Sequence, residues 1–191
     1  MKTILLSLIL FLSTTINTNA ELNRITYGNE NAKITIIAYE SLTCSHCATF
    51  HKEVYPKLKK EYIDTGLAKI EFRHFPLDIA ALNASIIAQC KEDQSLEILN
   101  SLYSDQQAWV KGNTIEDINE NLKKFLKKEG FNLDFEKCVN NKEIEDFVLN
   151  DRIEGVKTFK VNATPTIIIN DKKFEKSLNY KNLKKTLENL I

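Results

Sequence analysis

The sequence contains few Gly and Pro residues, and neither positive nor negative charge predominates. Of its 191 residues, 5 are Gly and 3 are Pro, which argues against a disordered or fibrous chain. Lys and Arg together number 26, as do Asp and Glu. Nucleic-acid-binding domains usually carry an excess of basic residues, so this balance argues against that class of protein.

The chain also lacks an apolar run that could span a bilayer, which needs about 20 residues. The most apolar stretch, residues 4–12, is shorter and follows Lys2. Residues 18–20 (T-N-A) then offer a small-residue cleavage site. A polytopic membrane protein is therefore excluded, and residues 1–20 are predicted to be a cleaved export signal.

In an exported chain, the four cysteines indicate possible disulfide bonds, because thiols tend to pair outside the cytoplasm. Cys44 and Cys47 are close in sequence, while Cys90 and Cys138 lie far apart. Four cysteines permit three pairings, and the sequence alone does not choose among them.

The apolar patterns predict an α/β domain. Residues 33–39 are rich in Ile, as in a buried central strand, and residues 68–75 alternate apolar with polar side chains. A helical pattern separates the two and contains Pro56, which should kink or split that helix. The order strand, helix, strand predicts a right-handed crossover and a parallel pair.

The middle of the chain shows only helical periods, from residue 78 to about residue 150. Thr114 and Asp117 have the spacing of a capping box at the start of one such helix. Strand signals return at residues 166–170, and an amphipathic helix is predicted for residues 180–190. The coarse prediction is an α/β domain split by a helical insertion.

The strongest chemical signal is the motif Cys44-Ser45-His46-Cys47, which follows a predicted strand and opens a helix. Free backbone N–H groups and the helix dipole favour negative charge at that position. The pKa of Cys44 should therefore be lowered, with His46 as a further donor or cation. A disulfide whose reduced form is stabilised in this way is a strong oxidant.

Three other interpretations of the motif are weaker. A zinc site needs a second ligand pair, which His51 and His74 do not form at ligand spacing. Covalent haem attachment needs His directly after the second cysteine, where the chain has Ala48. A purely structural disulfide across one helical turn would be strained.

A second signal is Pro165, between Thr164 and Thr166 at the start of a predicted buried strand. Proline cannot donate a ladder hydrogen bond, so it fits the first position of a strand. Taken alone, the position is better explained by a trans proline at the start of a strand, but the C-x-x-C motif upstream favours a cis peptide bond here.

Together these stretches resemble the DsbA family of thioredoxin-fold proteins, particularly its single-domain alphaproteobacterial branch. The matching segments are residues 36–51 (I-I-A-Y-E-S-L-T-C-S-H-C-A-T-F-H), 62–77 (Y-I-D-T-G-L-A-K-I-E-F-R-H-F-P-L) and 161–170 (V-N-A-T-P-T-I-I-I-N). The resemblance implies a thioredoxin fold with an inserted all-helical domain. The fold would comprise residues 21–77 and 148–191, and the insertion residues 78–147.

The resemblance also implies roles for the site residues. Cys44 would be the attacking cysteine and Cys47 the resolving one, facing a cis Pro165. Thr164 and Ser45 are expected to contact the substrate. Family members commonly have Pro where this chain has Ser45. The two residues between the cysteines tune the redox potential, so the resemblance implies the type of reaction but not the oxidising strength.

A second departure concerns the buried acid that many members carry six residues before the first cysteine, where this chain has Ala38. Strand alternation places Glu40 on the same face as Ala38, so Glu40 or water would have to serve proton transfer at Cys47. His51 is expected on the helix surface, and His74 has no evident partner.

The branch can carry a second, non-catalytic disulfide in the insertion, which here would join Cys90 and Cys138. Closing a loop of about 50 residues would add up to about 4 kcal/mol in the chain-entropy model. The alternative is two separate buried thiols that act as small apolar groups.

The sequence thus predicts a periplasmic thiol–disulfide oxidoreductase that acts as an oxidase, with exported reduced proteins as substrates. The resemblance implies reoxidation by a DsbB-like membrane quinone reductase. No metal or organic cofactor is needed, and a monomer is expected. The alternatives are a disulfide isomerase or reductase on the same fold, and a non-catalytic binding module or chaperone.

Overall fold

The computed structural model describes residues 22–191, so the predicted export signal lies outside the described residues. The elements in chain order are β1 (Ile25–Gly28), β2 (Ile34–Glu40), α1 (Ser45–Thr49), η1 (Phe50–Val54), α2 (Tyr55–Leu58), η2 (Lys59–Ile63), β3 (Ala68–His74), α3 (Ile79–Gln89), η3 (Glu92–Gln94), α4 (Ser95–Ser104), α5 (Gln106–Trp109), α6 (Ile115–Lys128), α7 (Phe135–Val139), α8 (Lys142–Phe159), β4 (Thr166–Ile169), β5 (Lys172–Lys173) and α9 (Tyr180–Glu188).

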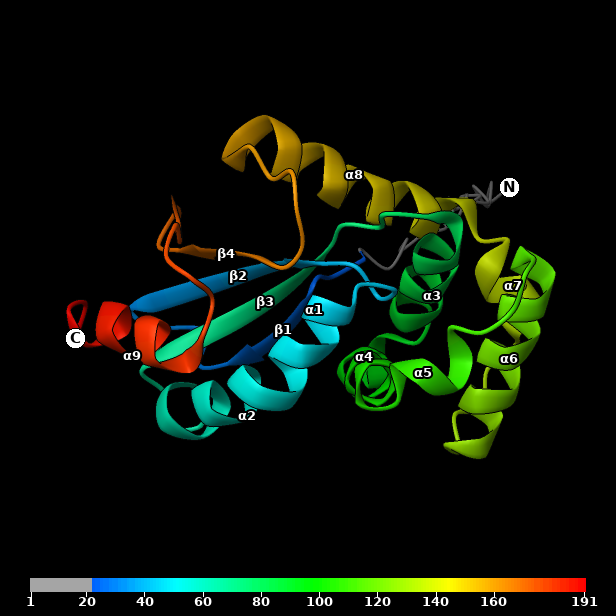
Figure 1. Ribbon diagram of the computed structural model, residues 1–191, viewed down its shortest axis with the longest axis horizontal. Helices are drawn as coiled ribbons and strands as arrows, with labels where there is room; N and C mark the ends of the chain where they lie inside the picture. Colours follow the sequence, from blue (N-terminus) through cyan, green and yellow to red (C-terminus); the bar gives the residue numbers. More distant parts are fainter. Residues whose placement is uncertain (1–21) are drawn as a thin grey trace, which may run out of the picture.

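The sheet has the order β1-β3-β2-β4-β5, with β2 in the centre (Figure 1). Strands β2 and β3 are parallel, which confirms the predicted crossover, and the other neighbours are antiparallel. Strand β1 is not among the predicted strands. Its four residues are too few to show an alternating pattern, and pairing with β3 defines them as a strand.

Alternation along β2 divides the core into two parts. Ile36 and Ala38 pack with the helices α1 to η2 and with α9, whereas Ile37 and Tyr39 pack on the opposite face, near the end of α8. Gly155 of α8 lies against the ring of Tyr39, where an added Cβ atom would come within 2.7 Å of the ring. The sheet is therefore the middle of three layers (Figure 1).

The helix that follows the C-x-x-C motif is continuous but irregular. It passes from α1 through the π-helical segment η1 into α2, and it ends in a second π-helical segment, η2. Pro56 lies in the first turn of α2, directly after η1. Proline lacks a backbone N–H, so the predicted disturbance takes the form of a wider turn before Pro56 rather than a break.

The segment between β3 and α8 consists of helices, as predicted, and lies beside one end of the sheet (Figure 1). Thr114 and Asp117 form the predicted capping box at the start of α6. Trp109 is fully buried in this segment and donates its indole N–H to the carbonyl oxygen of Leu102. The short helix α5 is not among the predicted elements.

A disulfide joins Cys90, which follows α3, to Cys138 in α7. It closes a loop that holds most of the helical segment. We expect the double variant Cys90→Ala/Cys138→Ala to unfold with a free energy lower by up to about 4 kcal/mol, because the cross-link limits the unfolded chain. Urea denaturation at equilibrium measures this difference.

The control for that measurement is Cys44→Ser/Cys47→Ser, which removes the other cysteine pair and keeps the Cys90–Cys138 bond. An unfolding free energy unchanged by Cys90→Ala/Cys138→Ala would show that the cross-link contributes nothing to stability.

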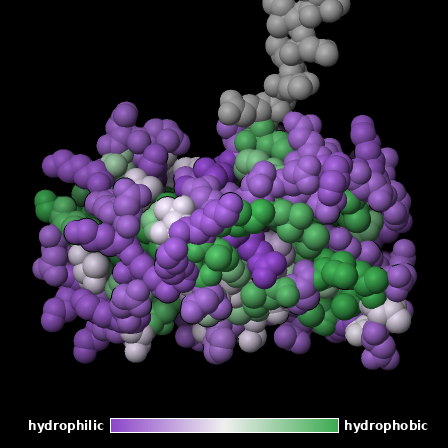
Figure 2. Space-filling view, turned by 90° about the horizontal axis from the view of Figure 1, so that it is seen from above, coloured by the Kyte–Doolittle hydropathy of each residue, from purple (hydrophilic) through white to green (hydrophobic). Residues whose placement is uncertain are grey.

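Polar and charged side chains dominate the face seen from above, with apolar side chains in separate patches (Figure 2). Within residues 22–191, no helix has both the length and the apolar character needed to cross a bilayer. The most exposed large apolar side chains include Leu77 and Ile79, which flank the start of α3.

Candidate active site

Cys44 lies at the N-cap of α1, after the central strand β2. Its backbone N–H donates to the carbonyl oxygen of Ser41, and its own carbonyl accepts the first helical hydrogen bonds, from Cys47 and Ala48. The Thr43 hydroxyl donates to the carboxylate of Asp78 at 2.8 Å, which ties this loop to the start of α3. The sulfur of Cys44 therefore sits at a helix start, as the sequence predicts.

The surroundings of Cys44 stabilise its thiolate. A hydrogen bond from the Cys47 thiol, together with Thr164 and the backbone N–H groups of Cys47 and His46, lowers the pKa of Cys44 to about 5 despite its partial burial. His46 thus contributes through its backbone, and its ring is exposed beside the site. At neutral pH a thiol with this pKa is almost entirely a thiolate.

Cys47 lies one turn further along the helix and is fully buried. Both cysteines are free thiols in this structure. Burial, the bond to Cys44 and the charge of Glu40 all raise the pKa of Cys47. One sulfur is thus accessible and ionised while the other is enclosed and protonated. This asymmetry suits a pair in which Cys44 exchanges with other thiols and Cys47 closes the disulfide.

Pro165 directly precedes β4, and the residue before it contacts Cys44. The Thr164–Pro165 peptide bond is cis, and the carbonyl oxygen of Thr164 lies 3.4 Å from the sulfur of Cys44, whose thiol form donates to it. Thr164 and Pro165 also line a groove of about 410 Å³ together with His46. Ser45 is exposed at the first turn of α1, outside the set of residues that line this groove.

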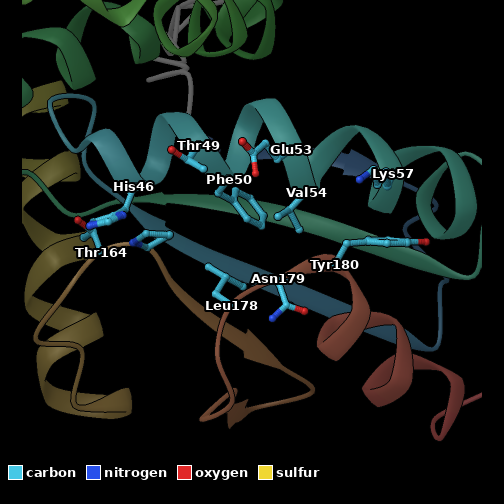
Figure 3. Close-up of a pocket in the computed structure, with 11 residues that line it drawn as sticks. His46, Thr49, Phe50, Glu53, Val54, Lys57, Thr164, Leu178, Asn179 and Tyr180 are labelled. Carbon is cyan, nitrogen blue, oxygen red and sulfur yellow. The ribbon is translucent and has the colours of Figure 1, made fainter.

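The groove runs from the motif along the helix (Figure 3). One wall is formed by His46, Thr49 and the residues that follow at helical spacing, and the other by Leu178, Asn179 and Tyr180 before and at the start of α9. Its open side and mixed polar and apolar walls can accept an extended peptide beside Cys44.

The family model described as Thioredoxin matches residues 20–189 of this chain. The chain belongs to the thioredoxin family. Among solved structures, alpha-DsbA1 of Wolbachia pipientis has 30% sequence identity and a TM-score of 0.78, with 88% of this chain and 90% of that chain covered. Within the thioredoxin family, this protein is DsbA-like, as the sequence predicts.

Curated relatives agree with this placement. "Disulfide bond formation protein D" of Bacillus subtilis is 27% identical over 172 residues, which cover 84% of this chain and 74% of that protein. A "putative protein-disulfide oxidoreductase" of Rickettsia typhi is 27% identical over 152 residues, 78% of this chain. The match covers 55% of the Rickettsia protein, so this DsbA-like chain spans about half the length of such relatives.

The buried pair Glu40–His51 corrects one prediction about this DsbA-like site. His51 was expected on the helix surface, but its ring lies inside the protein, with Nε2 2.8 Å from Oε2 of Glu40. The π-helical segment η1 widens the helix here, so positions read from a spacing of 3.6 residues per turn are shifted. Glu40 shares the face of Ala38, as strand alternation predicts.

His74 also differs from its prediction, which gave it no partner. It is buried at the end of β3, with ring Nε2 3.4 Å from Oε1 of Gln89 in α3. Its backbone N–H donates to the carboxylate of Asp151 in α8. Burial lowers the pKa of His74, so a neutral ring fits this site, which joins β3 to two helices.

Gln106 is a site residue that the sequence does not predict. Its buried side chain, from α5, donates to the carbonyl oxygens of Leu42 at 2.7 Å and Cys44 at 3.1 Å. The helical segment thereby holds the backbone on both sides of Thr43, directly before the motif. A single Gln in a four-residue helix offers no sequence signal for such a role.

The described part of the chain contains no group of three or more His, Cys, Asp or Glu side chains placed to hold a metal ion.

Proposed function

We propose that this protein is a thiol–disulfide oxidoreductase that acts as an oxidase on exported proteins. The observation that carries this proposal is the asymmetry of the two sulfurs, with an accessible Cys44 of pKa about 5 and a buried, protonated Cys47. Because the thiolate of Cys44 is stabilised, the reduced form is favoured, and the disulfide form readily gives its disulfide away. The curated names of the relatives support the same reaction class.

In the proposed cycle, a substrate thiolate attacks Cys44 of the Cys44–Cys47 disulfide. The bond between the two sulfurs breaks, Cys47 leaves with the electron pair and takes up a proton, and a mixed disulfide joins Cys44 to the substrate. A second substrate thiolate then attacks the substrate sulfur of that bond and releases Cys44 as a thiolate. The substrate has lost two electrons and the enzyme has gained them.

The peptide around the reacting substrate cysteine would lie in the groove beside Pro165. The backbone of Thr164 is close enough to Cys44 to contact that peptide. His46 lines the groove, and Ser45 is exposed directly after Cys44. We place the protein in the periplasm after removal of residues 1–20. A DsbB-like membrane quinone reductase would reoxidise it, as expected for a DsbA-like protein.

The redox equilibrium with glutathione tests the direction of the reaction. We expect a reduction potential above about −180 mV, the value of a disulfide isomerase, because the low pKa of Cys44 favours the reduced form. The fraction of oxidised protein, measured by alkylation and mass spectrometry over a range of glutathione ratios at pH 7, gives this potential.

A value near about −270 mV, as in thioredoxin, would contradict the oxidase and favour a reductase. A potential near −180 mV combined with repair of scrambled disulfides would favour the isomerase. Absence of any exchange would leave only a binding module or chaperone.

A further inference from the structure

A buried acid and imidazole lie behind the two cysteines. Glu40 and His51 have side chains only 3% and 5% exposed, and they contact each other through Oε2 and Nε2. The second carboxylate oxygen of Glu40, Oε1, is also buried and has no hydrogen-bond partner. A buried carboxylate oxygen without a partner is rare and calls for an explanation.

The pair is electrostatically coupled to both cysteines. Burial raises the pKa of Glu40, the charge of Cys44 raises it further, and His51 opposes the rise. Glu40 in turn adds to the raised pKa of Cys47. Glu40 therefore lies close enough to Cys47 for the charge of one to affect the ionisation of the other.

His51 connects Glu40 to the surface. Its ring stacks on Tyr103 of α4, with centroids 4.0 Å apart, and it lines a second groove of about 410 Å³ with Lys52, Asn100 and Ser104 among others. This groove lies between the helix and α4, and it shares no lining residue with the groove beside Pro165. Figure 3 shows that the first groove lies on the side of the helix that faces α9.

The two grooves matter because Cys47 must gain and lose a proton during each cycle although its sulfur has no contact with solvent. In the mixed disulfide, the substrate occupies Cys44 and the groove beside Pro165. The bound substrate would then block any proton route through the groove beside Pro165 at the step in which Cys47 exchanges its proton.

We propose that the Cys47 proton passes through Glu40 and His51 and leaves by the groove between the helix and α4. The substrate side and the proton side of the site are then separate. This inference rests on the proposed oxidoreductase function and adds to it two residues, of which Glu40 exchanges the proton with Cys47 and His51 links Glu40 to solvent.

Reoxidation by a disulfide removes one proton from Cys47. The Cys44 thiolate attacks the oxidant and forms a mixed disulfide, and half of the oxidant leaves as a thiolate. Oε1 of Glu40 takes the proton of Cys47, whose thiolate attacks the sulfur of Cys44 and releases the second half. As this proton reaches Oε1, the neutral carboxyl group of Glu40 gives the proton already on its Oε2 to Nε2 of His51. His51 then gives up the proton of its other ring nitrogen to water in the groove. In substrate oxidation, the proton moves inward along the same path to the departing Cys47.

Several other titratable or charged side chains surround the pair and bear on its pH dependence. They are Cys44 at the N-cap of α1, Cys47 from α1, Lys52 from η1, Tyr55 from α2, Lys59 from η2 and Tyr103 from α4.

Oxidation of the reduced full-length protein by oxidised glutathione separates the two chemical steps. Acid quenching followed by mass spectrometry resolves the mixed disulfide at Cys44 from the final Cys44–Cys47 disulfide. We expect Glu40→Gln and His51→Ala to slow only the second step, each by about 10²-fold, the usual size of a proton-transfer contribution. Formation of the mixed disulfide should change less than threefold.

Imidazole distinguishes proton transfer from a structural role. The variant His51→Ala opens space towards the second groove, so added imidazole should restore the second step in proportion to its concentration. 1,2,4-Triazole has a similar shape but is a much weaker base, and it should restore far less. Asn100→Ala changes the wall of the same groove without removing a titratable group, and it should resolve the mixed disulfide at the wild-type rate.

The proton route is wrong if His51→Ala or Glu40→Gln resolves the mixed disulfide as fast as wild type. It is also wrong if triazole and imidazole act equally on His51→Ala, since cavity filling would then explain the recovery. Failure of the wild-type protein to form either disulfide would instead contradict the proposed function. Circular dichroism of each variant establishes that it folds before rates are compared.

Discussion

Replacement of Cys44 with serine is expected to lower thiol–disulfide exchange to less than about one-thousandth of the wild-type rate. In catalytic groups that act together, removal of the nucleophile lowers the rate by at least about a thousandfold. Cys47 cannot substitute for Cys44, because it is fully buried and burial raises its pKa. Reduction of insulin disulfides by dithiothreitol, followed by turbidity, measures the rate.

Two further variants make that result specific to Cys44. Cys47→Ser keeps the reactive thiolate but lacks the resolving sulfur, so it should stop as a mixed disulfide that a non-reducing gel detects. Cys90→Ala/Cys138→Ala removes the other cysteine pair and should retain the exchange activity. Activity that survives in Cys44→Ser would contradict the proposed mechanism and favour a binding module.

The sequence predicts those parts of the site that depend on local structure. The position of Cys44 at a helix start follows from a strand directly before it, and the structure places Cys44 at the N-cap of α1. The residues that contact the motif come from distant parts of the sequence. Pro165 lies more than one hundred residues away, and only the resemblance to a family predicts that it faces Cys44.

The residues that the sequence did not predict act through contacts between distant segments. Gln106 holds the loop before the motif from a short helix whose four residues give no periodic signal. Regular helical spacing predicts His51 on the surface, but the π-helical segment before Pro56 changes which side chains face inward. Glu40 was placed on the correct face by alternation, but its contact with His51 depends on that irregular helix.

These differences have one physical basis. Strand alternation and helix caps are set within a few residues, and they are read reliably here for β2, for α1 and for the capping box of α6. Burial of a polar side chain depends on whether a partner comes from elsewhere in the fold. The polar groups around Cys47 are therefore the part of the site that requires a structure.

The stability of the protein should depend on pH in the reduced form and much less in the oxidised form. The thiol of Cys44 has a pKa of about 5 in the folded protein and an ordinary value near 9 in the unfolded chain. Between these pH values the unfolded chain holds a proton that the folded protein has released, so a rise in pH favours folding. This stabilisation is complete above about pH 9 and is lost as the pH falls through about 5.

We expect the free energy of unfolding of the reduced form to rise by about 1–2 kcal/mol between pH 5 and pH 7, relative to the oxidised form. This range is below the full linkage value because Cys44 is only partly buried and solvent screens its interactions. Urea denaturation of both redox forms in a Cys90→Ala/Cys138→Ala background gives the difference at each pH, since only the active-site pair then changes. The variant Cys44→Ser, compared with the same oxidised protein, should show no such rise in the free energy of unfolding between pH 5 and pH 7. A reduced form whose advantage stays constant over this range would mean that Cys44 ionises like an ordinary thiol, and the oxidising character derived from its thiolate would have no physical basis.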